Sequence, residues 1–134
     1  MGCIFCSIVA GAAPAWRVYE DGETVAFLDI RPVTVGHALV VPRRHAADIW
    51  SISEDDAAAV ARSVHRVAAL LRERLRPRGL SVTQSNGAAA WQDVFHYHVH
   101  LVPRYGDDDL RPPWRPTRPT PEALAEVHRR ITGR

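Results

Sequence analysis

The chain has 134 residues and a mass of 14.9 kDa, the size of one domain, and its 46% apolar and 24% charged residues suit a globular protein with a buried core. Its net charge of +2 is too small to argue for nucleic-acid binding, its two cysteines cannot build a disulfide scaffold, and no apolar run approaches the length of a membrane span. Residues 1–6 lack the basic leader and apolar stretch of a signal peptide, so we expect a cytoplasmic protein with reduced thiols.

Hydrophobic periodicity predicts five strands and two helices in chain order. The strands are expected at residues 16–20, 23–28, 37–41, 80–84 and 96–102, with an Asp21-Gly22 hairpin turn between the first two. A long helix is expected to begin after Ser53 and to end before Pro77. Its apolar stripe consists of Ala57, Val60, Ala61, Val64, Val67, Ala68, Leu71 and Leu75. Strands grouped around one long helix indicate an antiparallel α+β fold.

Composition changes near residue 104. Six of the ten prolines lie between Pro103 and Pro121, and residues 111–134 carry a net charge of +4, whereas the first 110 residues carry −2. We therefore expect a compact domain over residues 1–104, a Pro-rich connector over 105–120 and a helix over 121–134 that belongs to the same structural unit. That last helix is expected to pack either on the domain or on a second subunit.

Three alternating histidines are the sharpest feature of the sequence. On a strand, His96, His98 and His100 would share one face, and the apolar residues between them would pack on the helix from the other face. A chance pattern on a solvated strand is one interpretation. A metal site formed by the three imidazoles and a nucleophilic imidazole assisted by its neighbours are the two functional ones.

The segment His96-Tyr97-His98-Val99-His100-Leu101-Val102 resembles the His-φ-His-φ-His-φ-φ pattern of the histidine triad (HIT) superfamily, in particular its bacterial Hint-like hydrolases. Further segments resemble this family in the same order, from residue 1 to about residue 105: Cys3 to Ile8, Phe27 to Pro32, Gly36 to Pro42, Asn86 to Phe95, and Pro103-Arg104. The resemblance implies a HIT-like fold, with an antiparallel sheet of about five strands, one long helix and a C-terminal helix.

The resemblance implies that His98 is the nucleophile and forms a nucleotidyl-histidine intermediate at the α-phosphate. A neutral imidazole is a competent nucleophile near neutral pH. His100 and Gln92 are then the expected donors to the phosphoryl oxygens, together with the main-chain N–H groups of Asp93 and Val94. The Asp93 carboxylate itself is assigned no phosphate contact, because two negative charges repel each other.

The remaining substrate contacts are also implied by the resemblance. The apolar base pocket is expected to contain Phe5, Ile8, Phe27 and Ile30, for which plain core packing is the alternative. Asp29 is expected to accept hydrogen bonds from the ribose, although an aspartate at the end of a strand can equally hold a turn. The family's phosphate-side asparagine falls at Asn86 or one residue earlier, and Trp91 stands where relatives usually carry glycine.

A Cys-x-x-Cys pair alone is a weak signal for a metal site or a redox pair. In bacterial relatives a zinc ion is held by such a pair with two histidines, and the matching residues here are Cys3, Cys6, His45 and His96. A Cys2His2 set is closed and tetrahedral, so this zinc would be structural. No organic cofactor is expected.

The sequence therefore predicts a nucleotide hydrolase or transferase acting on a purine nucleoside phosphoramidate or a related conjugate. A dinucleoside polyphosphate hydrolase of the same superfamily is the first alternative. A nucleotide-binding regulatory module and a catalytic metal site at the three histidines are alternatives of other classes. The resemblance also implies a homodimer, with the long helix and an adjoining strand at the interface, and neither nucleic acid nor a membrane is an expected partner.

Overall fold

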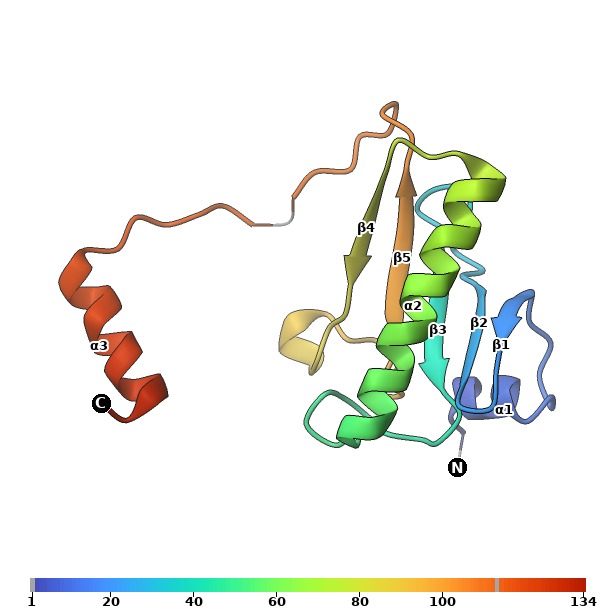
Figure 1. Ribbon diagram of the computed structural model, residues 1–134, viewed down its shortest axis with the longest axis horizontal. Helices are drawn as coiled ribbons and strands as arrows, with labels where there is room; N and C mark the ends of the chain where they lie inside the picture. Colours follow the sequence, from blue (N-terminus) through green and yellow to red (C-terminus); the bar gives the residue numbers. More distant parts are fainter. Residues whose placement is uncertain (1, 113) are drawn as a thin grey trace.

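The computed structural model describes residues 2–112 and 114–134, and its centre is a five-stranded antiparallel sheet (Figure 1). The strands are β1 (Arg17–Glu20), β2 (Thr24–Leu28), β3 (Ala38–Pro42), β4 (Gly79–Thr83) and β5 (Val99–Arg104), in the spatial order β1-β2-β3-β5-β4. The helices are α1 (Ile4–Val9), α2 (Glu54–Leu75) and α3 (Pro121–Thr132), with a short 3₁₀ turn, η1 (Ala88–Ala90). The predicted α+β fold with one long helix and a C-terminal helix is confirmed.

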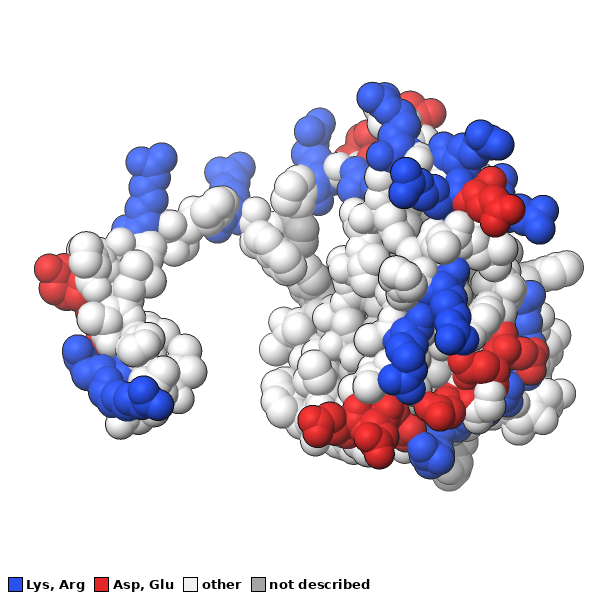
Figure 2. Space-filling view, viewed as in Figure 1, with Lys and Arg blue, Asp and Glu red and all other residues white. Residues whose placement is uncertain are grey.

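Helix α2 begins and ends where its terminal chemistry predicts. The Ser53 side chain accepts a hydrogen bond from the main-chain N–H of Asp56, and Arg76 closes the helix in the left-handed conformation. The first turn is acidic and the last turn basic, which suits the helix dipole. In Figure 2, acidic side chains accordingly gather at the end of the domain where α2 begins, and arginines gather at the opposite end.

The sheet has one apolar layer on each face. On the α2 side, Ala38 and Val40 of β3 pack with Val60, Val67 and Leu71 of the helix. On the opposite face of the sheet, Phe5 and Ile8 of α1 pack on the buried residues of β2 and β3 that point away from α2. These are Val25, Phe27, Leu39 and Val41. The alternation of side chains along β2 and β3 thus separates a packing core from the layer that carries the candidate site.

Only one of the three triad histidines, His100, lies on strand β5, although all three were expected on it. Strand β5 begins at Val99, so His96 and His98 precede it, whereas a strand from residue 96 was expected. The reason is that the Tyr97 N–H donates to the carbonyl oxygen of Ala46, in the loop after β3, and not to a neighbouring strand. The predicted separation of faces still holds, since Tyr97, Val99 and Leu101 all lie in the core beneath α2.

Residues 105–134, which we call the arm, leave the domain at the end of β5. The arm runs past β4, at the edge of the sheet, and carries α3 away from the domain (Figure 1). Helix α3 begins with Thr120 as its cap and Pro121 in its first turn, as predicted. None of its residues is buried, so it does not pack on its own domain. Within the described residues, no helix is long and apolar enough to cross a membrane.

Candidate functional site

A cavity of about 240 Å³ opens between α1, the end of β2 and the start of β5. Its apolar wall is formed by Phe5, Ile8, Phe27 and Leu39, all of them buried. Its polar side carries Asp29, Asp93, His98 and His100. Ile30 and Val94 line it as well, and Ile30 is 83% exposed at the mouth. The structure therefore gathers most of the sequence-predicted substrate residues around one cavity.

The His98 ring is held in one tautomer. Its Nδ1 lies 2.8 Å from the carbonyl oxygen of His96, and a carbonyl oxygen only accepts hydrogen bonds. Nδ1 therefore carries the proton of the neutral ring. Nε2 is therefore left with a free lone pair. This nitrogen lies 3.8 Å from an oxygen of the Asp93 carboxylate. This arrangement presents an unprotonated imidazole nitrogen at the cavity.

A second chain of hydrogen bonds orients His100. The main-chain N–H of Val33 donates to Nδ1 of His37 at 3.2 Å, so the proton of neutral His37 lies on Nε2. That Nε2 donates in turn to Nδ1 of His100 at 2.9 Å. His100 therefore carries its own proton on Nε2. Its ring packs against that of His98, with 4.9 Å between the ring centroids.

Burial keeps the rings of His37 and His100 neutral. It lowers the pKa of His100 to about 4, and the nearby His98 and His37 lower that pKa further, against the opposing effect of Asp29 and Asp93. Burial also lowers the pKa of His37, while the Asp29 carboxylate raises it. The hydrogen bonds described above place an imidazole lone pair on Nε2 of His98 and an imidazole N–H on Nε2 of His100 at the same cavity, which suits attack on a phosphorus atom whose oxygens need a donor.

Asp29 holds a turn, which was one of the two interpretations made from the sequence, and it also lines the cavity. One carboxylate oxygen accepts a hydrogen bond from the Arg31 N–H at 2.9 Å and so holds the turn after β2. The other lies 3.6 Å from Nε2 of His37 and faces the histidine cluster. The carboxylate therefore both shapes the mouth of the cavity and presents an acceptor to it.

Gln92 and Asn86 do not line this cavity. Gln92 is buried, and its amide donates to the carbonyl oxygens of Ala47 and Val94 and accepts from the Gly87 N–H. The Asn86 side-chain oxygen accepts from the main-chain N–H of Ile49. Both side chains thus tie loops together, and their expected contacts with a phosphate stay predictions.

Trp91 also lies outside the cavity. It has a positive φ of 72° and an exposure of 69%, and it closes η1. Its side chain lines a separate groove with Trp50 and Trp114.

The four proposed zinc ligands converge beside the cavity. Their ligand atoms all lie within 4.8 Å of one another. Nδ1 of His96 lies 3.2 Å from Nδ1 of His45 and 3.4 Å from Sγ of Cys3, and Sγ of Cys6 lies 3.3 Å from Nδ1 of His45. Tetrahedral zinc with the usual bond lengths requires about 3.3 Å between two nitrogens and about 3.6 Å between nitrogen and sulfur.

The second nitrogen of His96 is placed as a metal ligand needs. Nε2 donates to the carbonyl oxygen of Pro42 at 2.9 Å, which leaves Nδ1 free for a metal. The donor set and its spacing therefore fit zinc. Nδ1 of His96 lies near both thiols, and His98 belongs to neither of the two possible metal-binding clusters found among the described residues. This geometry is evidence against a metal site shared by all three triad histidines.

Sequence reasoning assigned no special role to His37 and did not consider Leu39 or Arg31, although all three take part in the site. Leu39 of β3 pairs with His100 of β5. Because alternate residues share a face, His37 stands diagonally across from His100. The register of β3 against β5 is the signal that would have identified His37, and a single sequence does not contain it.

Comparisons with known proteins identify the family of this chain. The family model described as "HIT domain" matches residues 10–107. The crystal structure of a HIT family member from Bacillus subtilis is 39% identical and superposes with a TM-score of 0.93 over 100% of this chain and 97% of that chain. A histidine triad nucleotide-binding protein from Candida albicans is 31% identical, with a TM-score of 0.87 over 98% of this chain and 96% of that one.

A third solved structure bears on the thiol cluster. It is a histidine triad family protein from Mycobacterium smegmatis, described as zinc-bound, which is 40% identical and has a TM-score of 0.79 over 96% of each chain. The family match covers most of the domain that carries the cavity, the histidine cluster and the four converging ligands. The chain belongs to the HIT family.

Proposed function

We propose that this protein is a nucleotide hydrolase or transferase that acts at the α-phosphate of a purine nucleoside phosphoramidate. The observation that carries the proposal is the pair of imidazoles with ring centroids 4.9 Å apart, in which hydrogen bonds leave the lone pair of His98 and the proton of His100 each on Nε2. A nucleophile and a donor to the phosphoryl oxygens are what a nucleotidyl-transfer reaction requires from the protein.

In the proposed first step, Nε2 of His98 attacks the α-phosphorus. A new N–P bond forms, and the P–N bond to the leaving amine breaks; its electron pair leaves with the amine, which takes up a proton from solvent water. Water then attacks the same phosphorus and gives up a proton, the bond to His98 breaks, and its electron pair returns to Nε2. The His100 N–H donates to the phosphoryl oxygen in both steps, where negative charge develops.

The rest of the cavity supports the same substrate class. Phe5, Ile8 and Phe27 form an apolar wall for a purine base, and Ile30 covers the mouth. Asp29 offers its free carboxylate oxygen to the ribose hydroxyls. For the phosphate, we assign the main-chain N–H groups of residues 93 and 94. Gln92 contributes indirectly, because its hydrogen bonds to Gly87 and Val94 position that loop.

We propose a structural zinc ion held by Cys3, Cys6, His45 and His96, which would attach the N-terminus to the segment that bears His98. Bound there, zinc would supply rigidity and no reacting group, because the four protein ligands complete its coordination. Thiolate ligands persist in a reducing compartment, so we place the protein in the cytoplasm.

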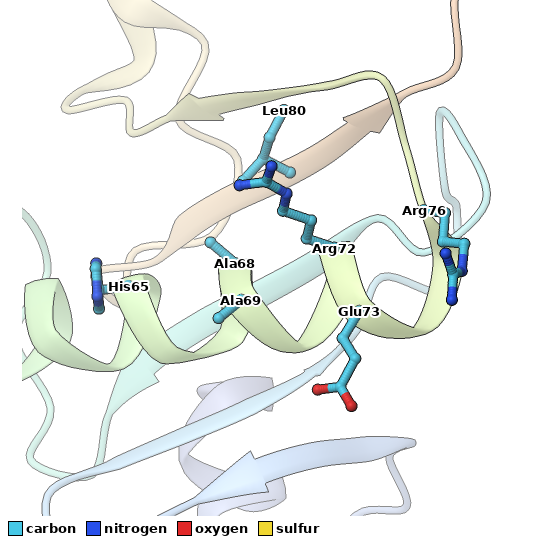
Figure 3. Close-up of a pocket in the computed structure, with 7 residues that line it drawn as sticks. All are labelled: His65, Ala68, Ala69, Arg72, Glu73, Arg76 and Leu80. Carbon is cyan, nitrogen blue, oxygen red and sulfur yellow. The ribbon is translucent and has the colours of Figure 1, made fainter.

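We further propose a homodimer through the face formed by α2 and β4. A shallow groove of about 660 Å³ runs along this face, with Ala68 and Ala69 on α2 and Leu80 on β4 (Figure 3). Val82, next along β4, is 49% exposed. Two α2 helices packed antiparallel would also bring the acidic start of each to the basic end of the other.

The catalytic proposal is tested with His98→Ala and adenosine 5′-phosphoramidate. We expect the variant to keep its fold and its affinity for AMP but to lose turnover by at least about a thousandfold. Arg62→Ala, at an exposed position of α2 that lines neither the cavity nor the groove, is the control and should retain turnover. Full activity of His98→Ala would refute the nucleophile assignment.

Two further measurements separate the alternatives. In a rapid-quench experiment at single turnover, intact-protein mass spectrometry should detect the added nucleotidyl group on the wild-type chain and not on His98→Ala. Tight AMP binding without any such adduct would instead favour a regulatory binding module. Rates on adenosine phosphoramidate and on diadenosine polyphosphates then decide between the two hydrolase activities, and a faster polyphosphate reaction would overturn the phosphoramidate assignment.

A further inference from the structure

The two cysteines of the chain lie side by side at the first turn of α1. The main-chain N–H of Cys6 donates to Sγ of Cys3 at 3.3 Å. Both thiols are free and half-buried, and their sulfur atoms lie within 4.8 Å of each other. Residues three apart on a helix have about 5–6 Å between their Cβ atoms, whereas a disulfide requires about 3.5–4.5 Å. A bond between these two thiols therefore requires a movement of the first turn of α1 and leaves the sheet in place.

An open groove leads from the surface to Cys3. Its volume is about 450 Å³, and it is lined by Cys3 and His45 together with Val94 and Phe95. His45 is itself exposed. A small oxidant such as hydrogen peroxide thus reaches the thiol cluster through this groove without any opening of the core.

Helix α1 connects the thiols to the nucleotide cavity. Phe5 stands between the two cysteines in the sequence, and its buried side chain belongs to the wall of the cavity. Its ring contacts the rings of His98 and His96 edge-on, with 5.2 and 6.0 Å between the centroids. His96 also links the two sites, because its Nδ1 faces the thiols and its carbonyl oxygen accepts from Nδ1 of His98. A movement of the first turn of α1 therefore reaches both the apolar wall and the His98 ring.

The zinc-bound state and the disulfide state of this cluster exclude each other. Two sulfur ligands of tetrahedral zinc lie about 3.8 Å apart, because each Zn–S bond is about 2.3 Å long. The sulfur atoms of a disulfide lie about 2.05 Å apart. Oxidation also removes the thiolate charges that zinc binding requires. The Cys6 N–H then loses a charged acceptor at the first turn of the helix, because a disulfide sulfur carries no charge.

We propose that Cys3 and Cys6 form a site of reversible oxidation, at which hydrogen peroxide joins the two thiols, releases zinc and weakens nucleotide binding. The proposal rests on the zinc site and the nucleotide cavity proposed above. It adds a modification that links them, so that the occupancy of the cavity depends on the oxidation state of the two thiols.

The oxidation proceeds in two steps. The Cys3 thiolate, which lines the groove, attacks one oxygen of the peroxide; an S–O bond forms, the O–O bond breaks and hydroxide leaves. The Cys6 thiolate then attacks the Cys3 sulfur; an S–S bond forms, the S–O bond breaks and a second hydroxide leaves. The two sulfur atoms lose two electrons, which the peroxide gains, and both hydroxides take up protons from solvent. A dithiol reductant reverses the modification by thiol–disulfide exchange.

The test treats the full-length, zinc-loaded chain with hydrogen peroxide. Mass spectrometry should show that the tryptic peptide 1–17, which contains both cysteines, has lost two hydrogen atoms. A chromogenic chelator should count one zinc ion released per chain. Isothermal titration calorimetry should show that the Kd for AMP rises about tenfold. Dithiothreitol with added zinc should restore the original Kd.

Two controls separate the disulfide from other effects of the treatment. In Cys3→Ser with Cys6→Ser, peroxide should leave the Kd for AMP unchanged. The chain has one further sulfur atom, in Met1, and its oxidation is common to both proteins. Removal of zinc from the wild type by a chelator under reducing conditions should raise the Kd less than peroxide does, because the two thiols are then not joined.

Sulfinic acid on either cysteine in place of the disulfide, or a disulfide that leaves the Kd for AMP unchanged, overturns the proposal. So does an equal rise in Kd after zinc removal alone. If the double variant does not fold, the wild type decides by itself, because a loss of AMP affinity that dithiothreitol and zinc do not reverse contradicts a disulfide. A reduced chain that does not bind AMP contradicts the proposed function instead, and the peptide mass and the zinc count then still decide whether the modification occurs.

Discussion

Acid should destabilise the fold through His100 by an amount that the structure allows us to calculate. This imidazole accepts a proton near pH 4 in the folded chain and near pH 6.5 in the unfolded chain, mainly because of its burial. Between these values the unfolded chain binds more protons, so stability falls as the pH falls. Above pH 6.5 the neutral His100 ring takes nothing away from the free energy of unfolding. At 1.36 kcal/mol per pKa unit, about 2 kcal/mol is lost by pH 5 and about 3 kcal/mol by pH 4.

The variant His100→Asn isolates this contribution. Asparagine does not titrate, and its side-chain oxygen can still accept the hydrogen bond that His37 donates to His100. Urea unfolding, followed by circular dichroism from pH 7 to pH 4, gives the free energy of unfolding of both proteins. Acid release of a metal from the thiol cluster affects the two proteins equally and cancels in the difference. From pH 7 to pH 5 the free energy of unfolding of the wild type should fall by about 2 kcal/mol relative to that of His100→Asn.

Parallel curves for the two proteins over this pH range would refute the reasoning. A gap of the opposite sign would mean that His100 gains a proton more readily in the folded chain, which burial beside two other imidazoles does not allow.

Four further predictions concern separate parts of the structure. His37→Phe should lower kcat about tenfold with little change in KM, because His100 loses the donor that sets its tautomer; steady-state kinetics measures both. Cys6→Ser should abolish stoichiometric zinc in elemental analysis and lower the Tm. Val82→Arg should weaken the dimer at least tenfold by sedimentation. Ser63→Ala should cost about 1–2 kcal/mol in urea unfolding, because the buried hydroxyl of Thr24 loses its 2.6 Å partner.

Local chemistry in the sequence predicted much of the fold. The Asp21 carboxylate accepts from the N–H groups of Glu23 and Thr24, so the Asp21-Gly22 turn forms where two apolar runs meet. Alternation in the triad segment correctly separated Tyr97 and Val99 from the histidines. These successes depend on neighbours within a few residues of one another, where spacing alone determines geometry.

What the sequence did not predict depends on contacts between distant segments. The role of His37 follows from the register of β3 against β5. The burial of Gln92 was not predicted either, because it depends on the carbonyl oxygens of Ala47 and Val94, to which its amide donates. The start of β5 was misplaced because Tyr97 pairs with a loop 51 positions earlier, at Ala46.

The two hydrogen-bond chains at the histidine cluster each end on the main chain. One begins at the N–H of Val33 and passes through His37 to His100, and the other runs from His98 into the carbonyl oxygen of His96. Hydrogen bonds to the peptide backbone thus determine which nitrogen of each ring carries the proton, and no ionised side chain is needed for this. Position 33, whose own side chain is 53% exposed, therefore tolerates almost any residue except proline, which has no N–H to start the chain.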